Sequence, residues 1–313
     1  MTKKGKEMKV AMGIDVGGSK IRGGIVDNDG TLRSVREIST EADKGASHVL
    51  ARILFIIKEL WQPEIIGVGI GTAGQVSFEG TIIGATNVIQ GWSGLPLREL
   101  IEREIKLPVR VVNDVQAMAL GELYFGEGKG VHHYLCLALD TGVGGAIVVN
   151  RKIFRGTTGA AGEIGHLVIH RNGRSCPCGR KGCLEAYVSG TALMKSYEEK
   201  TGHQLKASEI IRNSVLGKGV EAEIVKDFLG DLADALASLV YLFDPEKIIL
   251  GGGLAKELLP YCEQLTDMVK CQLSPARRSI FQLSISPLEG NAMILGAASL
   301  FLKEGEFYNE AME

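Results

Sequence analysis

Several features of other protein classes are missing from this sequence of 313 residues. No apolar run approaches the ~20 residues that a membrane-spanning helix needs, and the polar segment 1–8 contains no apolar region of a signal peptide. The formal net charge of −2 provides no general attraction to nucleic acid or to an anionic membrane. We therefore expect a cytoplasmic protein that binds neither nucleic acid nor membranes.

The sequence also lacks two familiar nucleotide-binding motifs. It contains no G-x-x-x-x-G-K-[ST] Walker loop, and neither of the glycine-rich turns that follow Asp15 and Asp140 opens a helix as a Rossmann fingerprint requires. Linkers rich in Pro or Ser and low-complexity segments are absent as well. The hydrophobic fraction of 45% and the 41 glycines are typical of a globular α/β protein, and the length allows two domains.

One motif, however, occurs twice. An apolar run ends at Asp15 and is followed by the turn Val16-Gly17-Gly18-Ser19-Lys20; another ends at Asp140 and is followed by Thr141-Gly142-Val143-Gly144-Gly145. Because a second apolar run follows each turn, each copy predicts a β-hairpin. Clustered glycines let backbone N–H groups surround an anion, and the aspartate suits hydrated Mg²⁺. One copy alone would favour an ordinary turn, whereas two copies favour a clamp for nucleotide phosphates.

Hydrophobic periodicity predicts alternating strands and helices along the chain. Strands are expected at 9–15, 21–27, 31–38, 65–70, 109–112, 134–139, 146–149, 248–250 and 281–285. Helices are expected at about 45–60, 95–105 and 115–125, over most of the chain after 190, and from 292 onward. The order β-β-β-α-β-α-β-α, met again in the second half, favours two related α/β domains that face a cleft.

Three thiols lie within eight residues, at Cys176, Cys178 and Cys183. Thiolate and imidazole are preferred zinc ligands, and a structural site needs four of them. The nearest fourth ligand is His166, with His170 as a rival, and free or redox-active thiols are the alternative interpretation. The remaining cysteines are expected to be packing residues in a reducing compartment: Cys136, Cys262 and Cys271.

A carboxylate follows directly after the predicted strand 109–112. The pair Asn113-Asp114 stands at the strand end, where α/β sheets place functional side chains. A carboxylate in such a place can remove a proton from a hydroxyl nucleophile. The alternative is that the pair only caps the following helix.

Together these segments resemble the ROK family of sugar kinases and repressors, over nearly the whole chain. The most specific parts are Gly162-Glu163-Ile164-Gly165-His166 and the cysteine run followed by Leu184-Glu185-Ala186. The resemblance implies an α/β, two-domain actin-like ATPase (ribonuclease H-like) fold with a cleft between the domains. We expect a small N-terminal α/β domain of residues 1–115 plus 296–313, and a larger C-terminal α/β domain of residues 116–295 that carries a zinc-binding loop.

The resemblance also implies ATP-dependent phosphorylation of a hexose at its 6-hydroxyl, with Asp114 as the catalytic base. The implied sugar-binding residues are Gly74 in the turn Gly71-Thr72-Ala73-Gly74, Asn113, Asp114, Glu163, His166 and Glu185. The implied ligands of a structural Zn²⁺ are His166, Cys176, Cys178 and Cys183. The implied residues for ATP and Mg²⁺ are Asp15, Gly17, Gly18, Ser19, Lys20, Asp140, Thr141, Gly142, Gly144, Gly145, Gly251, Gly252 and Gly253.

The resemblance leaves the sugar open. Glucokinases of the family often carry Pro-Asn-Leu ahead of a tryptophan, where this chain has Thr86-Asn87-Val88 followed by Ile89-Gln90-Gly91-Trp92. The Ile89-Gln90 pair is also similar to N-acetylmannosamine kinases. We expect glucose, with N-acetylmannosamine or N-acetylglucosamine as the alternative. Trp92 has two interpretations: it stacks on the sugar, or it packs in the core.

Two other classes fit less well. A ROK repressor carries a helix-turn-helix domain before the first hairpin, and only about eight residues precede that hairpin here. An actin-like structural ATPase would need neither sugar-binding carboxylates nor a cysteine cluster. The family resemblance further suggests a homodimer.

Overall fold

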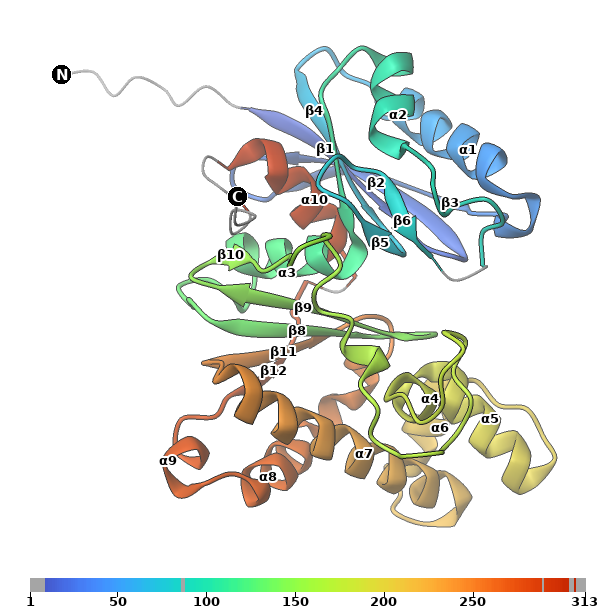
Figure 1. Ribbon diagram of the computed structural model, residues 1–313, viewed down its shortest axis with the longest axis vertical. Coiled ribbons are helices and arrows are strands. Elements are labelled where there is room, and N and C mark those ends of the chain that lie inside the picture. Colours follow the sequence, from blue (N-terminus) through green and yellow to red (C-terminus); the bar gives the residue numbers. More distant parts are fainter. Residues whose placement is uncertain (1–8, 86–87, 289, 304–306, 308–313) are drawn as a thin grey trace. The chain divides into compact units, whose positions relative to one another are not determined.

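The computed structural model describes residues 9–85, 88–288, 290–303 and 307, which form two compact units (Figure 1). Of these residues, the first unit comprises 9–85, 88–129, 155–161, 291–303 and 307, and the second comprises 130–154, 162–288 and 290. The sequence had placed the boundaries at 115/116 and 295/296 instead. They differ because helix α3 (Asp114–Phe125) packs closely on helix α10 (Ala292–Leu302). A Cβ on Gly121 would lie 2.2 Å from the Ala292 carbonyl oxygen, so α3 and the start of α10 stay in one unit.

The first unit is built on a five-stranded sheet in the order β3-β2-β1-β4-β7. Its strands are β1 (Val10–Val16), β2 (Lys20–Asp27), β3 (Leu32–Ser39), β4 (Ile65–Thr72) and β7 (Val109–Asn113). A small two-stranded sheet joins β5 (Gln75–Val76) to β6 (Ile82–Gly84). The other helices of this unit are α1 (Ala46–Glu59), α2 (Leu97–Ile105) and the 3₁₀ turn η1 (Ala42–Lys44).

The second unit repeats this sheet in the order β10-β9-β8-β11-β12. Its strands are β8 (Tyr134–Leu139), β9 (Val143–Val149), β10 (Lys152–Ile153), β11 (Lys247–Gly251) and β12 (Leu283–Ile285). Its helices are α4 (Glu185–Val188), α5 (Gly190–Thr201), α6 (Ala207–Ser214), α7 (Gly219–Phe243), α8 (Cys262–Gln272) and α9 (Pro275–Arg278), with 3₁₀ turns η2 (Ile164–His166) and η3 (Ala255–Tyr261). In each sheet three antiparallel strands are followed by two parallel ones.

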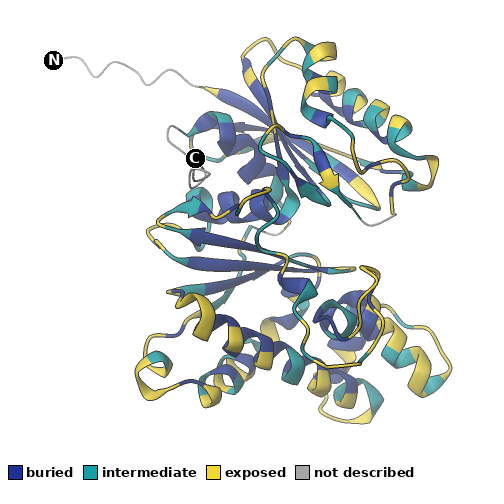
Figure 2. Ribbon diagram, viewed as in Figure 1, coloured by how far each residue is buried: buried dark blue, intermediate teal, exposed yellow. Residues whose placement is uncertain are grey.

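Each unit buries its own apolar core, drawn in dark blue in Figure 2. Helix α1 shows how the pattern produces the packing, because Val49, Ile53, Ile56 and Ile57 recur at helical spacing and are all buried. The predicted strands and helices agree with the observed bounds to within one or two residues at most ends. Sequence patterns did not indicate the short strands β5, β6 and β10.

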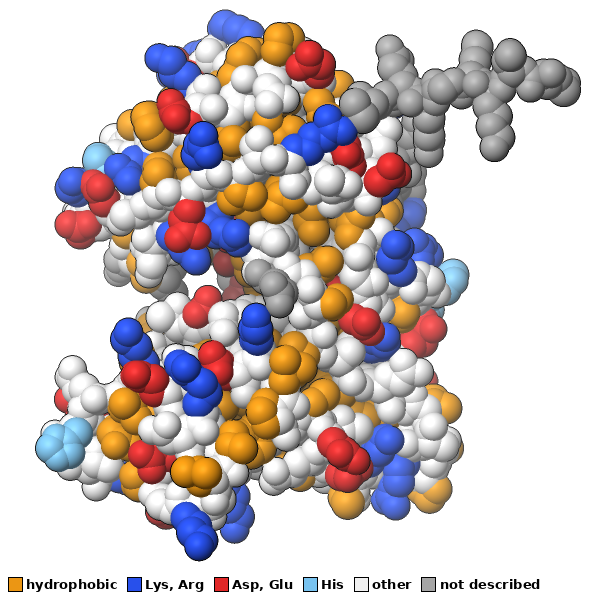
Figure 3. Space-filling view, turned by 180° about the vertical axis from the view of Figure 1, so that it is seen from behind, with side chains coloured by type: hydrophobic (Ala, Val, Ile, Leu, Met, Phe, Trp, Pro, Cys, Tyr) orange, Lys and Arg blue, Asp and Glu red, His pale blue; other side chains and the backbone are white. Residues whose placement is uncertain are grey.

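The described surface carries charges of both signs. On the face seen in Figure 3, Lys and Arg side chains are interspersed with Asp and Glu side chains. Within the described ranges, no helix combines the length and the apolar character that crossing a bilayer requires.

Candidate active site

The first glycine hairpin forms as predicted. Strands β1 and β2 pair with Asp15 opposite Arg22, and the Gly17 N–H donates to the Lys20 carbonyl oxygen at 3.0 Å to close the turn. On its other side β1 runs parallel to β4, which places Asp15 beside Gly71. The aspartate therefore stands at the carboxyl end of a central strand, next to the turn that follows β4.

Three parallel strand ends meet in this unit. Thr72 of β4 is paired with Val16 of β1 and with Asn113 of β7. The Asn113 side-chain amide donates to the Gly74 carbonyl oxygen at 3.0 Å, while its Oδ1 accepts the Val115 and Gln116 N–H groups at 2.9 and 3.2 Å. Asn113 thus caps α3 and also fixes the turn 71–74 beside it.

Asp114 occupies the first turn of α3 and is half-buried. Its Oδ1 accepts the N–H of Val115 at 2.9 Å. The N-terminal turn of a helix favours a carboxylate through its outward-pointing N–H groups. The side chain is consequently held at the carboxyl end of β7.

Trp92 belongs to the core. Its side chain is buried, with 1% of its surface exposed, and its Nε1–H donates to Thr72 Oγ1 at 3.3 Å. Sugar stacking by Trp92 is therefore the wrong interpretation, and packing is the correct one. Thr86 and Asn87, which the comparison with Pro-Asn-Leu used, lie outside the described residues.

The second glycine hairpin also forms as predicted, with Leu139 paired to Val143. The Asp140 N–H donates to the Gly142 carbonyl oxygen at 3.0 Å, and Asp140 Oδ1 accepts the Thr141 N–H at 3.0 Å. Strand β11 runs parallel to β8 and brings Gly251 opposite Ala138. A Cβ on Gly253 would lie only 3.1 Å from Asp140 Oδ1, so Gly253 lies against the aspartate of the hairpin, while Gly252 lies against the Leu139 backbone.

The segment 162–166 lies directly against β9. A Cβ on Gly165 would come within 1.9 Å of the Val143 carbonyl oxygen, so only glycine fits there. This close approach determines where Glu163 and His166 stand relative to the second hairpin. The Nε2 of His166 lies 3.7 Å from Glu163 Oε2.

The cysteine cluster gathers four potential ligand atoms. One atom each from His166, Cys176, Cys178 and Cys183 lies within 4.8 Å of the other three. His166 directs Nδ1 to this group, 3.7 Å from the Cys176 sulfur, and Cys178 lies 3.7 Å from Cys183. Three sulfurs and one imidazole nitrogen are the donor set of a structural zinc site, so the cluster fits Zn²⁺ in both chemistry and spacing.

The thiols of this cluster differ in their pKa values. Burial raises the pKa of Cys176 to about 12. Burial also opposes ionisation of Cys178, but hydrogen bonds from the Arg180 backbone and the Cys176 thiol lower the pKa of Cys178 to about 7. A cation that binds all three sulfurs must therefore displace protons as it binds.

His170, the rival ligand, lies outside the cluster. Its Nε2 is 2.8 Å from Asp231 Oδ1 on α7.

Among the cysteines expected to be packing residues, Cys136 is buried and Cys262 is partly exposed. The expectation is wrong for Cys271, which is exposed on α8.

Glu185 makes contacts that the sequence did not indicate. Its Oε2 accepts the Val143 N–H at 2.9 Å, and its Oε1 lies 3.7 Å from the Cys176 sulfur. One carboxylate thus joins the second glycine hairpin to the cysteine cluster.

The segment 155–161 packs against β5 and α3, which was not predicted from the sequence. Arg155 is buried and donates to the Val76 and Ser77 carbonyl oxygens, and Gln116 donates to the Gly159 carbonyl oxygen at 3.0 Å. Gln116 follows Asp114 by two positions on α3. The glycines at 156 and 159 were the available signal, because both adopt positive φ.

Comparisons with known proteins agree with this arrangement. The model of the ROK family matches residues 11–304. A glucokinase of Streptomyces coelicolor is 33% identical, covering 94% of this chain and 98% of its own length. The solved structure of a ROK family glucokinase from Streptomyces griseus, in complex with glucose and AMPPNP, superimposes with a TM-score of 0.84 at 30% identity, covering 93% of this chain and 98% of that one.

A relative with another sugar specificity is also similar. An N-acetylmannosamine kinase of Vibrio cholerae is 30% identical, covering 93% of this chain and 98% of its own length. The two-domain actin-like ATPase fold of the Streptomyces griseus glucokinase is the fold to which the two sheets described above belong.

Proposed function

Because the chain belongs to the ROK family, we propose that it is an ATP-dependent sugar kinase that phosphorylates the 6-hydroxyl of glucose. The observation that carries the proposal is the position of Asp114, at a strand end beside the turn 71–74 and fixed there by the first turn of α3. A sugar hydroxyl is a weak nucleophile and needs its proton removed as the bond to phosphorus forms. A positioned carboxylate contributes about 10²–10⁴-fold to the rate of such a step.

The sugar contacts are assigned to three residues in each unit. In the first unit they are Gly74, Asn113 and Asp114, of which a hydrogen bond joins Asn113 to Gly74. In the second unit they are Glu163, His166 and Glu185, which lie around the cysteine cluster. Carboxylates suit a polyol because each can accept two hydroxyl hydrogens. His166 has Nδ1 directed to the sulfurs, which leaves Nε2 on the side of Glu163 for a sugar hydroxyl.

The nucleotide contacts are assigned to the two glycine hairpins and the 251–253 turn. Gly253 leaves the space beside the Asp140 carboxylate empty of side chain, as the approach of a phosphate chain requires. Asp15 and Asp140 are the residues that would hold hydrated Mg²⁺, and that ion would neutralise charge on the phosphates. Phosphoryl transfer depends mainly on positioning and charge neutralisation, which these elements would provide.

Zn²⁺ is assigned to His166, Cys176, Cys178 and Cys183. The bound ion would fix the loop of residues 166–183, hereafter the cysteine loop, and would take no part in the chemistry. Three neighbouring thiols that serve as metal ligands must stay reduced, which supports a cytoplasmic site of action. The family resemblance further supports a homodimer, which light scattering of the purified protein would test.

A coupled ADP-release assay with a panel of sugars tests the proposal. The panel contains glucose, mannose, fructose, N-acetylmannosamine and N-acetylglucosamine. We expect glucose to give the highest kcat/KM. N-acetylmannosamine is the second candidate, favoured by the similarity of Ile89-Gln90 and by the Vibrio cholerae relative. A response to none of the sugars would refute the kinase proposal, and a preference for an N-acetylated sugar would refute only the glucose assignment.

A further inference from the structure

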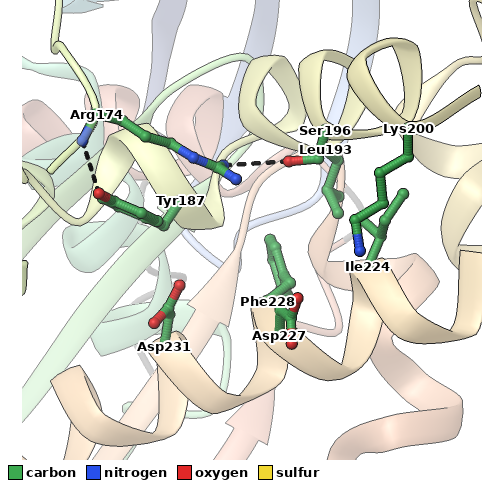
Figure 4. Close-up of a pocket in the computed structure, with 9 residues that line it drawn as sticks. All are labelled: Arg174, Tyr187, Leu193, Ser196, Lys200, Ile224, Asp227, Phe228 and Asp231. Atoms are coloured by element: carbon green, nitrogen blue, oxygen red, sulfur yellow. Dashed lines mark hydrogen bonds between the residues drawn. The ribbon is translucent and has the colours of Figure 1, made fainter. Parts of the chain in front are cut away.

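A group of polar side chains next to the cysteine loop has no role in the proposed reaction. They surround a pocket of about 40 Å³, which has room for water but not for a sugar. Figure 4 shows Arg174 and Tyr187 on one side of this pocket and Asp227, Phe228 and Asp231 of α7 on the other. The pocket is too small to bind a substrate. These residues instead join three segments, namely the cysteine loop, α4 and α7.

Tyr187 contacts the cysteine loop through both its hydroxyl group and its ring. Its hydroxyl oxygen accepts the Arg174 backbone N–H at 2.7 Å, and the Arg174 guanidinium lies 4.9 Å from the centre of its ring (Figure 4). The His170 ring also packs against Tyr187, with the ring centres 4.4 Å apart. A Cβ on Gly173 would lie 2.0 Å from the tyrosine oxygen, so the loop backbone is pressed against it.

A second anchor ties the same loop to a long helix. The Nε2 of His170 lies 2.8 Å from Asp231 Oδ1, and it must be the donor because the carboxylate can only accept. Asp231 belongs to α7, whose 25 residues form the longest helix of the described chain. His170 stands between the ligands His166 and Cys176, so the cysteine loop is held by α7 as well as by its metal-binding side chains.

These contacts act on Glu185 through a short helix. Helix α4 has only four residues, begins with Glu185 and contains Tyr187. Fixing the tyrosine therefore fixes the direction of the helix that carries the carboxylate. Glu185 then reaches the Val143 N–H with one oxygen and the cysteine cluster with the other.

We propose that His170, Tyr187 and Asp231 are positioning residues for sugar binding, which hold the cysteine loop and α4 so that Glu185 keeps this orientation. The inference rests on the proposed kinase function, because Glu185 is there assigned to the sugar. It predicts an effect on sugar affinity that is larger than the effect on ATP affinity, since none of the three residues belongs to the segments assigned to the nucleotide.

Two pairs of variants test the proposal by steady-state kinetics and calorimetric sugar binding. His170→Leu removes the donor to Asp231, whereas His170→Gln keeps an N–H group at the same reach. Tyr187→Leu removes the ring and the hydroxyl, whereas Tyr187→Phe keeps the ring against His170. We expect the leucine variants to raise the sugar KM and Kd about tenfold, because displaced binding groups lose their contacts, with the ATP KM within about twofold. The Gln variant should restore most of the sugar affinity.

The matched control is His203→Leu, because His203 is exposed in the same unit and its hydrogen bonds to Thr201 are made by its backbone N–H and carbonyl oxygen. It should bind sugar like the wild type. An unchanged sugar KM in His170→Leu, a parallel loss of ATP and sugar affinity, or no recovery in His170→Gln would each overturn the inference. Wild-type protein that phosphorylates no sugar would instead overturn the proposed function, so the two failures are distinguishable. If a leucine variant does not fold, Asp231→Asn, which weakens the same hydrogen bond, takes its place.

Discussion

Replacing Gly165 with alanine tests how tightly the segment 162–166 must lie against β9. The added Cβ would stand 1.9 Å from the Val143 carbonyl oxygen, where ordinary contact begins at 3.4 Å. One of the two backbones must therefore move by roughly 1.5 Å, the difference between these distances. Overpacking of this kind costs about 1–3 kcal/mol of stability.

Either movement damages the proposed sugar site. If the segment moves, it displaces Glu163 and His166. If β9 moves, the hydrogen bond from the Val143 N–H to Glu185 is lost. Because a displacement of ~1 Å can cost about 10²-fold in rate, we expect Gly165→Ala to lower kcat/KM for the sugar by about that factor.

The assay combines coupled ADP release with thermal unfolding. The matched control is Gly230→Ala, because Gly230 lies within α7 and an added Cβ there meets nothing within 4 Å. Alanine should stabilise that helix by ~0.5–1 kcal/mol and leave the activity unchanged. A Gly165→Ala protein with wild-type kcat/KM and wild-type unfolding temperature would refute the reasoning from close approach.

Three further outcomes are expected. Cys178→Ser should lower the bound zinc measured by mass spectrometry well below one per chain, and full zinc occupancy in this variant would contradict the assigned ligand set. Gly253→Val should raise the ATP KM more than the sugar KM, since its side chain would fill the space beside the Asp140 carboxylate; equal shifts would count against the nucleotide assignment. Trp92→Phe should cost at least ~1 kcal/mol in denaturant unfolding, because it loses the bond to Thr72 and part of a buried ring, whereas wild-type stability would contradict the packing interpretation.

Local signals in the sequence predicted the elements that the site is built on. Both hairpins were predictable because an aspartate and clustered glycines between two apolar runs determine a turn without help from distant residues. The cysteine spacing predicted a metal site for the same reason, while the choice of His166 over His170 depended on family resemblance. The structure supports this choice, because His170 is engaged by Asp231 instead.

Local sequence signals could not predict the contacts between segments that lie far apart in the chain. The hydrogen bond from Val143 to Glu185 joins residues 42 positions apart, and nothing in the periodicity of either segment indicates it. The docking of segment 155–161 through Arg155 and Gln116 is of the same kind. Burial of Trp92 likewise depends on the tertiary packing around Thr72 rather than on its sequence neighbours.

The single-turnover rate of phosphoryl transfer in Asp114→Asn tests the central claim most directly. The measurement is made with the enzyme in excess over ATP and at saturating glucose, with glucose binding to the variant confirmed separately. If Asp114 removes the proton from the sugar hydroxyl, the rate of sugar phosphate formation should fall by about 10²–10⁴-fold while the glucose Kd changes little. Transfer at the wild-type rate would contradict the assignment of Asp114 as the catalytic base.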